Sequence, residues 1–293
     1  MSFVDGKIRQ EISEFLTTRR ARLTPEAAGL PNYGGTRRVA GLRREEVAML
    51  AGVSVDYYTR IERGNIDGVS DSVLDAIMRV LNLDATEQKY LRNLAQVSAG
   101  RVQKRRKPQT NSVRPGLIRL IDALPDAPTY IRNGRLDILA ANALATELFG
   151  VMGDLSSGRV NLARFFFLDP NAQEFFVDWE RIAGDTVGVL RAEASKDPFD
   201  KDLSDLIGEL STRSELFSSK WANHNVYEHR MGTKRFRHAE IGEIELFYEG
   251  LEMPTDPGLT VVSYMADPNT PAADSLKLLA MKVHASSKGL GLD

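Results

Sequence analysis

Residues 42–65 read LRREEVAMLAGVSVDYYTRIERGN, and this stretch predicts two short helices joined by a tight turn. Gly52 is able to adopt a positive φ at the turn, and Ser54 is a favourable N-cap for the helix that follows. Gly64 then ends the second helix. This spacing is typical of a helix-turn-helix motif, whose second helix enters the major groove of DNA.

Both helices carry apolar residues at helical spacing. In the first helix, Val47, Leu50 and Ala51 are expected to point inward. In the second helix, Tyr58 and Ile61 share one face, so we expect them to pack against the first helix. The other positions of the second helix are then left for the surface.

Three residues of the second helix suit the edges of DNA bases. Val55 suits a thymine methyl group, Asp56 suits the N4 amino group of cytosine, and Arg60 suits O6 and N7 of guanine. The alternative is that these residues only form the solvated face of a small helical domain. Contacts with phosphates are predicted for Arg37, Arg38, Arg43, Arg44, Ser54 and Thr59.

Further helices are predicted around this pair. Residues 7–23 have apolar residues at helical spacing, and residues 25–41 form a loop rich in Gly and Pro. Ser70 is expected to cap a fourth helix and Thr86 a fifth. The five helices indicate a compact all-α domain, which we place at residues 1–97.

Charge and composition differ between the two parts of the chain. Residues 1–114 hold 20 Lys and Arg against 13 Asp and Glu, whereas residues 115–293 hold 18 against 27, which favours a polyanionic partner for the first part only. Residues 98–112 include the basic run KRRK and have the composition of a linker. The chain has no cysteine, so we expect no disulfide. It has no leader-like start and no long apolar run, so we expect no membrane contact. We therefore expect a cytoplasmic, nucleoid-associated bacterial protein.

Strand and helix patterns are mixed in the second part. Asn133-Gly134 lies between two strand-like runs and predicts a type I′ hairpin. Residues 161–222 look helical, and strands are predicted again at 226–230 and 234–238, around a turn at 231–233, and at 243–251 and 259–265. This order predicts an α+β domain with helices on one face of a sheet over residues 113–270, followed by a helical tail at 271–293.

Two resemblances to known families follow from these motifs. Residues 7–97 resemble the helix-turn-helix domain of the Xre class of bacterial and phage repressors, most densely over residues 37–64. The segments PTYIRNGRLDILAANALATELFG (128–150) and GEIELFYEGL (242–251) resemble an MmyB-like ligand-binding domain. That resemblance implies a PAS-like sensor fold with a pocket between sheet and helices for a long-chain fatty acid or a similar acyl compound.

Such a ligand requires an apolar tunnel with a polar group at its mouth. Arg191 is predicted to meet the carboxylate, and His224 or Tyr130 to donate a hydrogen bond. The alternative is that the aromatic residues form an ordinary core and that Arg191 is a surface or helix-end arginine. The predicted lining consists of Phe165, Phe175, Trp179, Phe217 and Trp221.

The sequence therefore predicts a two-domain regulator of transcription. His224, His229 and His238 lie close in sequence without a metal-binding or catalytic motif, so we expect no enzyme activity, no metal and no cofactor. The predicted function is a repressor that binds a double-stranded DNA operator as a homodimer and responds to an apolar ligand. Two alternatives remain: a second domain that serves dimerisation or protein interaction without a ligand, or an enzyme joined to a DNA-binding domain.

Overall fold

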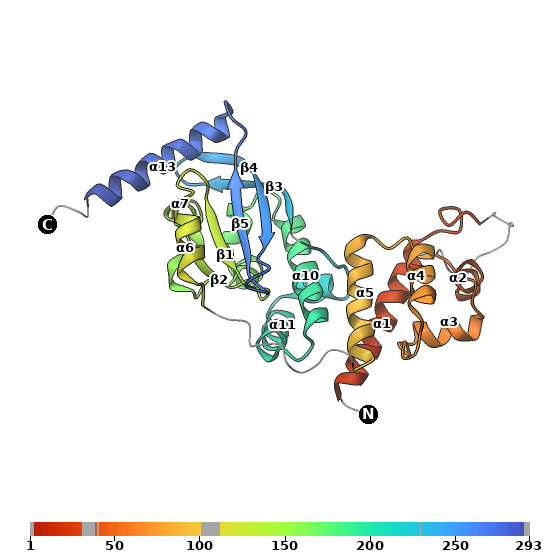
Figure 1. Cartoon of the computed structure of the whole chain (residues 1–293). Coiled ribbons are helices and arrows are strands. Elements are labelled where there is room, and N and C mark those ends of the chain that lie inside the picture. Colours follow the sequence, from red (N-terminus) through yellow and green to blue (C-terminus); the bar gives the residue numbers. More distant parts are fainter. Residues whose placement is uncertain (1–2, 31–38, 40, 101–111, 229, 290–293) are drawn as a thin grey trace.

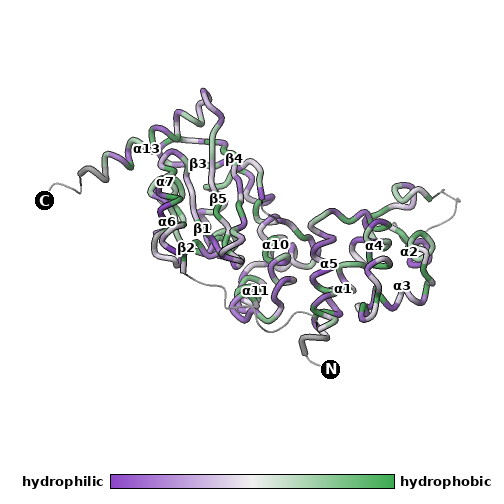
Figure 2. Tube along the Cα trace, viewed as in Figure 1, coloured by the Kyte–Doolittle hydropathy of each residue, from purple (hydrophilic) through white to green (hydrophobic). Residues whose placement is uncertain are grey.

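The computed structural model describes residues 3–30, 39, 41–100, 112–228 and 230–289. The chain forms an all-helical N-terminal part and a C-terminal part built on a sheet, and the two lie side by side (Figure 1). Among the described residues, no helix is long and apolar enough to cross a membrane. Figure 2 agrees, since hydrophobic stretches along the helices are interrupted by hydrophilic residues.

Five helices make up the N-terminal part, as predicted. They are α1 (Phe3–Arg22), α2 (Arg44–Ala51), α3 (Val55–Glu62), α4 (Asp71–Val80) and α5 (Ala85–Ser98). Their core is apolar and fully buried, with Phe15 and Leu16 from α1 packed among residues of the other helices. Asp84, rather than the predicted Thr86, caps α5, because its carboxylate accepts the Glu87 amide at 2.8 Å.

The turn between α2 and α3 follows the predicted chemistry. Gly52 has φ +69° and ends α2, and the Ser54 hydroxyl accepts the Tyr57 amide at 3.1 Å at the start of α3. Tyr58 and Ile61 are fully buried, as expected. Leu50 differs from the prediction, because its side chain is 38% exposed and the inward position on α2 is taken by Ala48.

The C-terminal part contains one antiparallel sheet in the order β2-β1-β5-β4-β3. Along β4 the burial alternates, so that Ile244, Leu246 and Tyr248 face the core as predicted. The strands are β1 (Thr129–Arg132), β2 (Ile138–Ala141), β3 (Met231–His238), β4 (Gly242–Glu252) and β5 (Thr260–Met265).

Two turns differ from their predictions. The turn after β1 is longer than a two-residue type I′ hairpin, because Asn133 and Asp137 bridge it with three hydrogen bonds and Leu136 takes the positive φ. The predicted turn at 231–233 is instead the start of β3, where Gly232 pairs with Tyr248 of β4. Residues 226–228 precede that strand without joining it.

Helices cover the sheet mainly on one face, as the α+β prediction requires. Helix α6 packs on the opposite face, where Leu117 and Ile121 meet Ile131 and Val261. Helix α13 packs on α7 and β4 through Leu276 and Leu279 and then extends away from the sheet (Figure 1). These helices are α6 (Pro115–Asp122), α7 (Ala143–Leu148), α8 (Leu162–Leu168), α9 (Asn171–Phe175), α10 (Trp179–Lys196), α11 (Lys201–Arg213), α12 (Glu215–Trp221) and α13 (Pro271–Gly289).

Candidate DNA-binding surface and ligand site

Helix α3 presents a mixed face at the surface of the N-terminal part. Val55 is 46% exposed, Asp56 and Arg60 are exposed, and Thr59 is half-buried. These four side chains therefore lie on the side of α3 away from the core residues Tyr58 and Ile61. An exposed helix face of this length and composition is suited to the major groove.

Arg60 is held against the loop that follows α3. Its Nη2 donates to the Asp67 carbonyl at 2.7 Å, and its guanidinium lies 5.6 Å from the centre of the Tyr57 ring. To reach guanine, Arg60 has to exchange this carbonyl for acceptors on the base. Tyr57, which the sequence reasoning missed, is half-buried beside it and supports the arginine by a cation–π contact.

The predicted phosphate contacts divide into two kinds. Arg43 is exposed at the start of α2, where its only ion-pair partner among the described residues is the exposed Glu45. Arg44 is also exposed, but it pairs with the buried Glu62 at 2.8 Å, which Arg20 binds as well. Burial raises the pKa of Glu62, but hydrogen bonds from Arg20 and Arg44 outweigh it and hold the pKa below its ordinary value. Arg44 therefore contributes to the fold.

The other predicted phosphate contacts involve Ser54 and the loop before α2. The Ser54 hydroxyl is exposed but already serves as the N-cap of α3, so it can meet a phosphate only while accepting the Tyr57 amide. Arg37 and Arg38 lie outside the described residues.

The predicted lining residues of the C-terminal part form two groups rather than one lining. Tyr130 and Phe175 both contact Phe149, in a cluster packed against the sheet. Phe217 and Trp221 stack on each other at 5.6 Å, on α12. Phe165 joins the first group through Phe176, since Phe165 and Phe175 each contact the Phe176 ring. This packing fits an apolar core. The first group, formed by Tyr130, Phe149 and Phe175, lies between the sheet and the helices.

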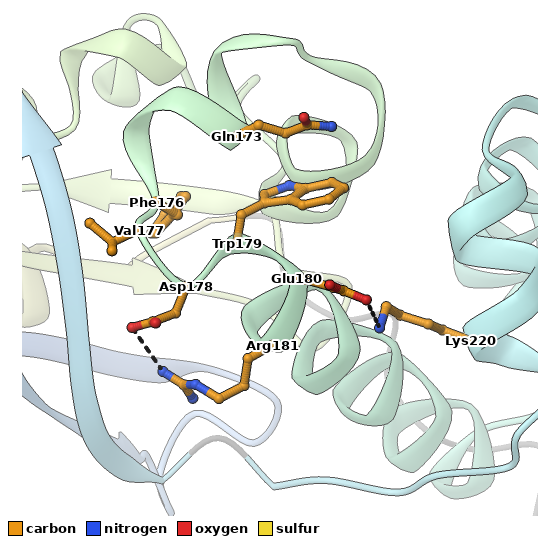
Figure 3. A pocket seen from close by; sticks show the side chains of 8 residues that line it. All are labelled: Gln173, Phe176, Val177, Asp178, Trp179, Glu180, Arg181 and Lys220. Atoms are coloured by element: carbon orange, nitrogen blue, oxygen red, sulfur yellow. Dashed lines mark ion pairs between the residues drawn. The ribbon is translucent and has the colours of Figure 1, made fainter.

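An open depression of about 670 Å³ lies beside the first cluster. Trp179 is the only predicted ligand residue among those that line it, and its indole Nε1 donates to the Phe166 carbonyl at 3.0 Å. Its rim is charged, with Glu180 paired to Lys220 and Asp178 to Arg181 (Figure 3). The lining residues are Gln173, Phe176, Val177, Asp178, Trp179, Glu180, Arg181 and Lys220.

A second depression, of about 500 Å³, lies along α13. Ala280 and Met281 give it an apolar wall, and Lys277 and His284 stand on the same helix. None of the predicted ligand residues contributes to it.

Arg191 and His224 meet each other, but at the contact between the two parts of the chain. Arg191 on α10 is 1% exposed, binds the Glu11 carboxylate of α1 and stacks 4.1 Å from the centre of the Trp221 ring. His224 Nδ1 lies 3.0 Å from Arg191 Nη1, and its Nε2 lies 3.1 Å from Glu14 Oε2. The structure thus places three predicted ligand residues, Arg191, Trp221 and His224, against the N-terminal part.

Glu11 is the centre of this contact. Burial raises its pKa, but the hydrogen bond with His224, the Arg191 charge and a hydrogen bond from Tyr90 outweigh burial and lower the pKa to about 2. Glu11, Glu14 and His224 bring their ligand atoms within 4.8 Å of one another, as in a metal site. The Arg191 guanidinium already supplies a positive charge beside the Glu11 carboxylate, so we interpret the cluster as an ion-pair network.

More polar contacts extend the same interface along α5. Lys89 pairs with Glu228 at 2.6 Å, and the Asn93 amide donates to the Ser195 hydroxyl at 3.2 Å. Arg19 of α1 donates to the His224 carbonyl at 2.6 Å. These contacts fix the α1–α5 pair against α10 and the segment after α12.

Two buried cations of the C-terminal part were missed by the sequence reasoning. Lys234 is 7% exposed and Arg132 is 6% exposed, and both point into the helix-covered side of the sheet. The available signal was strand alternation, because Lys234 precedes the core residue Phe236 by two positions and Arg132 follows Tyr130 by two.

Comparison with family models accounts for most of the chain. Residues 113–279 match the MmyB-like transcription regulator ligand binding domain, and residues 11–91 match a helix-turn-helix domain. No individual curated protein matches the sequence. Both matched models describe regulatory domains rather than catalytic ones.

Proposed function

The chain belongs to the MmyB-like transcription regulators, and we propose that it is a repressor controlled by a long-chain fatty acid or a similar acyl compound. Its helix-turn-helix domain and its ligand-binding domain make it a ligand-responsive DNA-binding regulator. The finer points of the proposal are the sign of regulation, the acyl ligand, the homodimer and the nucleoid location. We assign the domains to residues 1–97, 113–270 and 271–293, with a linker at 98–112.

The observation that carries the proposal is the polar interface between the two domains. Helix α10 belongs to the sensor domain, and its Arg191 is buried against Glu11 of the DNA-binding domain. A ligand that binds beside α10 therefore acts on an element that also holds α1. Ligand binding changes DNA affinity only if the ligand favours one orientation of the two domains over another.

On DNA, we assign base contacts to Val55, Asp56 and Arg60, and phosphate contacts to Arg43 and Thr59. One helix-turn-helix unit reads a short half-site, so a homodimer that reads two half-sites one helical turn apart, about 34 Å, gains both affinity and specificity. The exposed Leu278 and Met281 on α13 offer an apolar surface for a second copy.

The test is selection of bound DNA from a random pool by the full-length protein, with and without palmitate. We expect a palindromic sequence to be enriched without ligand and to be lost when palmitate is added. Enrichment that is the same in both pools would contradict control by an acyl ligand. Failure to enrich any sequence would contradict specific DNA binding.

The packing of aromatic rings in the core of the C-terminal domain favours a second candidate function. Phe149 contacts Tyr130, Phe175, Phe236 and Tyr264 with ring centroids 5.1 to 6.3 Å apart, which is the geometry of a filled aromatic core. In this second candidate, the C-terminal domain serves dimerisation and binds no ligand. Native mass spectrometry separates the two candidates, because only the sensor gains the mass of an added fatty acid.

A further inference from the structure

A row of polar side-chain tips crosses the helix-covered face of the sheet. Lys234 Nζ lies 3.5 Å from the Tyr264 hydroxyl, and that hydroxyl lies 3.5 Å from the hydroxyl of Tyr130. Lys234 Nζ also lies 4.8 Å from the centre of the Tyr248 ring. All four side chains are more than nine-tenths buried, so this row lies inside the domain.

Arg132 continues the row on β1. It lies two residues after Tyr130 on the same face of the strand, and its Nη1 donates to the neighbouring Asn133 carbonyl at 3.2 Å. Burial and, to a smaller extent, the nearby charge of Arg132 lower the pKa of Lys234 to about 7, against an opposing effect of Asp185. Two cations therefore lie close enough to repel each other in the core.

Neither cation has an acidic partner within 4 Å among the residues that the structure describes. Asp185 pairs with Arg181 at 3.1 Å, and Glu193 pairs with Lys196 at 2.8 Å. The other buried arginines differ in this respect. Arg191 meets Glu11, Arg19 meets Glu87 and Arg135 meets Asp202.

Uncompensated buried charge is costly, and natural cores normally pair it. These two cations and the hydroxyls of Tyr130 and Tyr264 form a donor set for a single anionic group. Lys and Arg donate only, and a tyrosine hydroxyl donates as well, so a carboxylate satisfies all of them. The surrounding rings are apolar, which suits a ligand with one charged end and an apolar tail.

We propose that Lys234 and Arg132, with the hydroxyls of Tyr130 and Tyr264, bind the carboxylate of the ligand. This assignment rests on the proposed function, because it places the head of an acyl ligand within the sensor domain. It replaces Arg191, which is already bound to Glu11, as the carboxylate partner.

The tail has a route from the charged depression beside α10. Phe176 lines that depression, as Figure 3 shows, and its ring lies 5.4 Å from that of Phe236. Phe236 in turn lies 5.6 Å from Tyr264 and two residues from Lys234 on the same strand face. Entry of an acyl chain therefore separates the rings of Phe176 and Phe236 and leads to the buried cations.

The experiment compares palmitic acid with its methyl ester, which has the same tail but no charge. Affinities are measured by calorimetry on the full-length protein. We expect the wild type to prefer the acid by about tenfold to hundredfold, the range for hydrogen bonds to a charged group. In Lys234→Met this preference should fall to near unity, while the ester binds as before.

A matched control separates the subsite from the charged rim. Lys220→Met removes a lysine that lines the depression and should leave the preference for the acid unchanged. A folding control uses the protein without ligand: Lys234→Met should unfold at the same temperature as the wild type or higher, because it removes an unpaired buried charge.

The outcomes are distinct. If Lys234→Met keeps the preference for the acid, or if the wild type binds acid and ester equally, the carboxylate subsite is overturned and an acyl sensor remains. If the wild type binds neither compound, both the subsite and the acyl sensor are overturned. If only Lys220→Met loses the preference for the acid, the carboxylate binds at the rim of the depression, and the subsite at Lys234 and Arg132 is overturned.

Discussion

At the scale of single residues, our assignments give Arg60 a base contact and Arg43 a phosphate contact, so the two arginines are expected to respond differently to substitution. Arg60 lies on the exposed face of α3, and Arg43 lies exposed before α2 with a surface partner only. Arg60→Ala should lose about 1–3 kcal/mol of specific binding and relax the preference at one base position. Arg43→Ala should weaken binding evenly across sequences and reduce its salt dependence. Competition binding with a panel of single-base operator variants measures both effects, and equal losses on every sequence for both variants would place the reading face elsewhere.

Glu11 makes the interface between the domains sensitive to acid. Its folded pKa of about 2 lies below the ordinary value of 4.5, so the unfolded chain binds the proton more readily. The contribution of Glu11 to the free energy of unfolding is therefore complete above pH 4.5. It is lost as the pH falls from 4.5 towards 2, and the loss is at most about 3 kcal/mol. Glu11→Gln should flatten the pH dependence of unfolding in this window, as followed by urea titration. An unchanged slope would mean that other carboxylates cause the acid sensitivity.

The residue scale also marks the limit of what the sequence predicts. The roles of Gly52, Ser54, Tyr58 and Ile61 were readable because they depend on neighbours within one turn of helix. Arg191 was assigned to a ligand carboxylate, whereas it contacts Glu11, 180 residues away in the chain. Nothing in the local sequence of α10 reports that partner, because it depends on how two domains meet.

At the scale of elements, Gly64 and Gly52 both have positive φ but differ in their surroundings. A Cβ at Gly64 would lie 2.1 Å from the Arg9 carbonyl oxygen of α1, whereas at Gly52 it would meet nothing within 4 Å. Gly52→Ala should cost only the left-handed backbone penalty, about 1–2 kcal/mol. Gly64→Ala should cost clearly more, because it also forces α1 away from the end of α3. Chemical denaturation measures both variants, and equal costs would mean that α1 moves freely.

Elements were predicted well where their signal is periodic and less well at their ends. Strand β4 was found from its alternation and the helix pair from its apolar spacing. The turn after β1 was not, because the side chains of Asn133 and Asp137, rather than the Asn-Gly pair, determine it. The start of β3 was taken for a turn because Gly232 is a turn residue, although pairing with β4 holds it extended.

At the scale of the whole molecule, the interface between the domains is the link that we propose between ligand and DNA. It joins α1 and α5 to α10 and the segment after α12 through ion pairs and hydrogen bonds rather than a large apolar surface. Polar interfaces between domains of one chain permit relative motion. The composition of the chain did not reveal this link, although the opposite net charges of the two parts are consistent with it.

A paired substitution tests that link without leaving a charge buried alone. Glu11→Gln combined with Arg191→Met removes both charges at the centre of the interface, whereas Arg191→Met alone takes the guanidinium away from a largely buried carboxylate. In the paired variant we expect operator affinity without ligand to change little, because neither residue lies on α3. The ratio of operator affinities with and without palmitate should fall towards unity, because the ligand no longer favours one domain orientation. Arg213→Met, an exposed arginine paired with Glu209, is the matched control and should keep the wild-type ratio. The ratio is measured by fluorescence anisotropy on the full-length chain, and a paired variant with the wild-type ratio would show that the coupling runs through contacts other than Glu11 and Arg191.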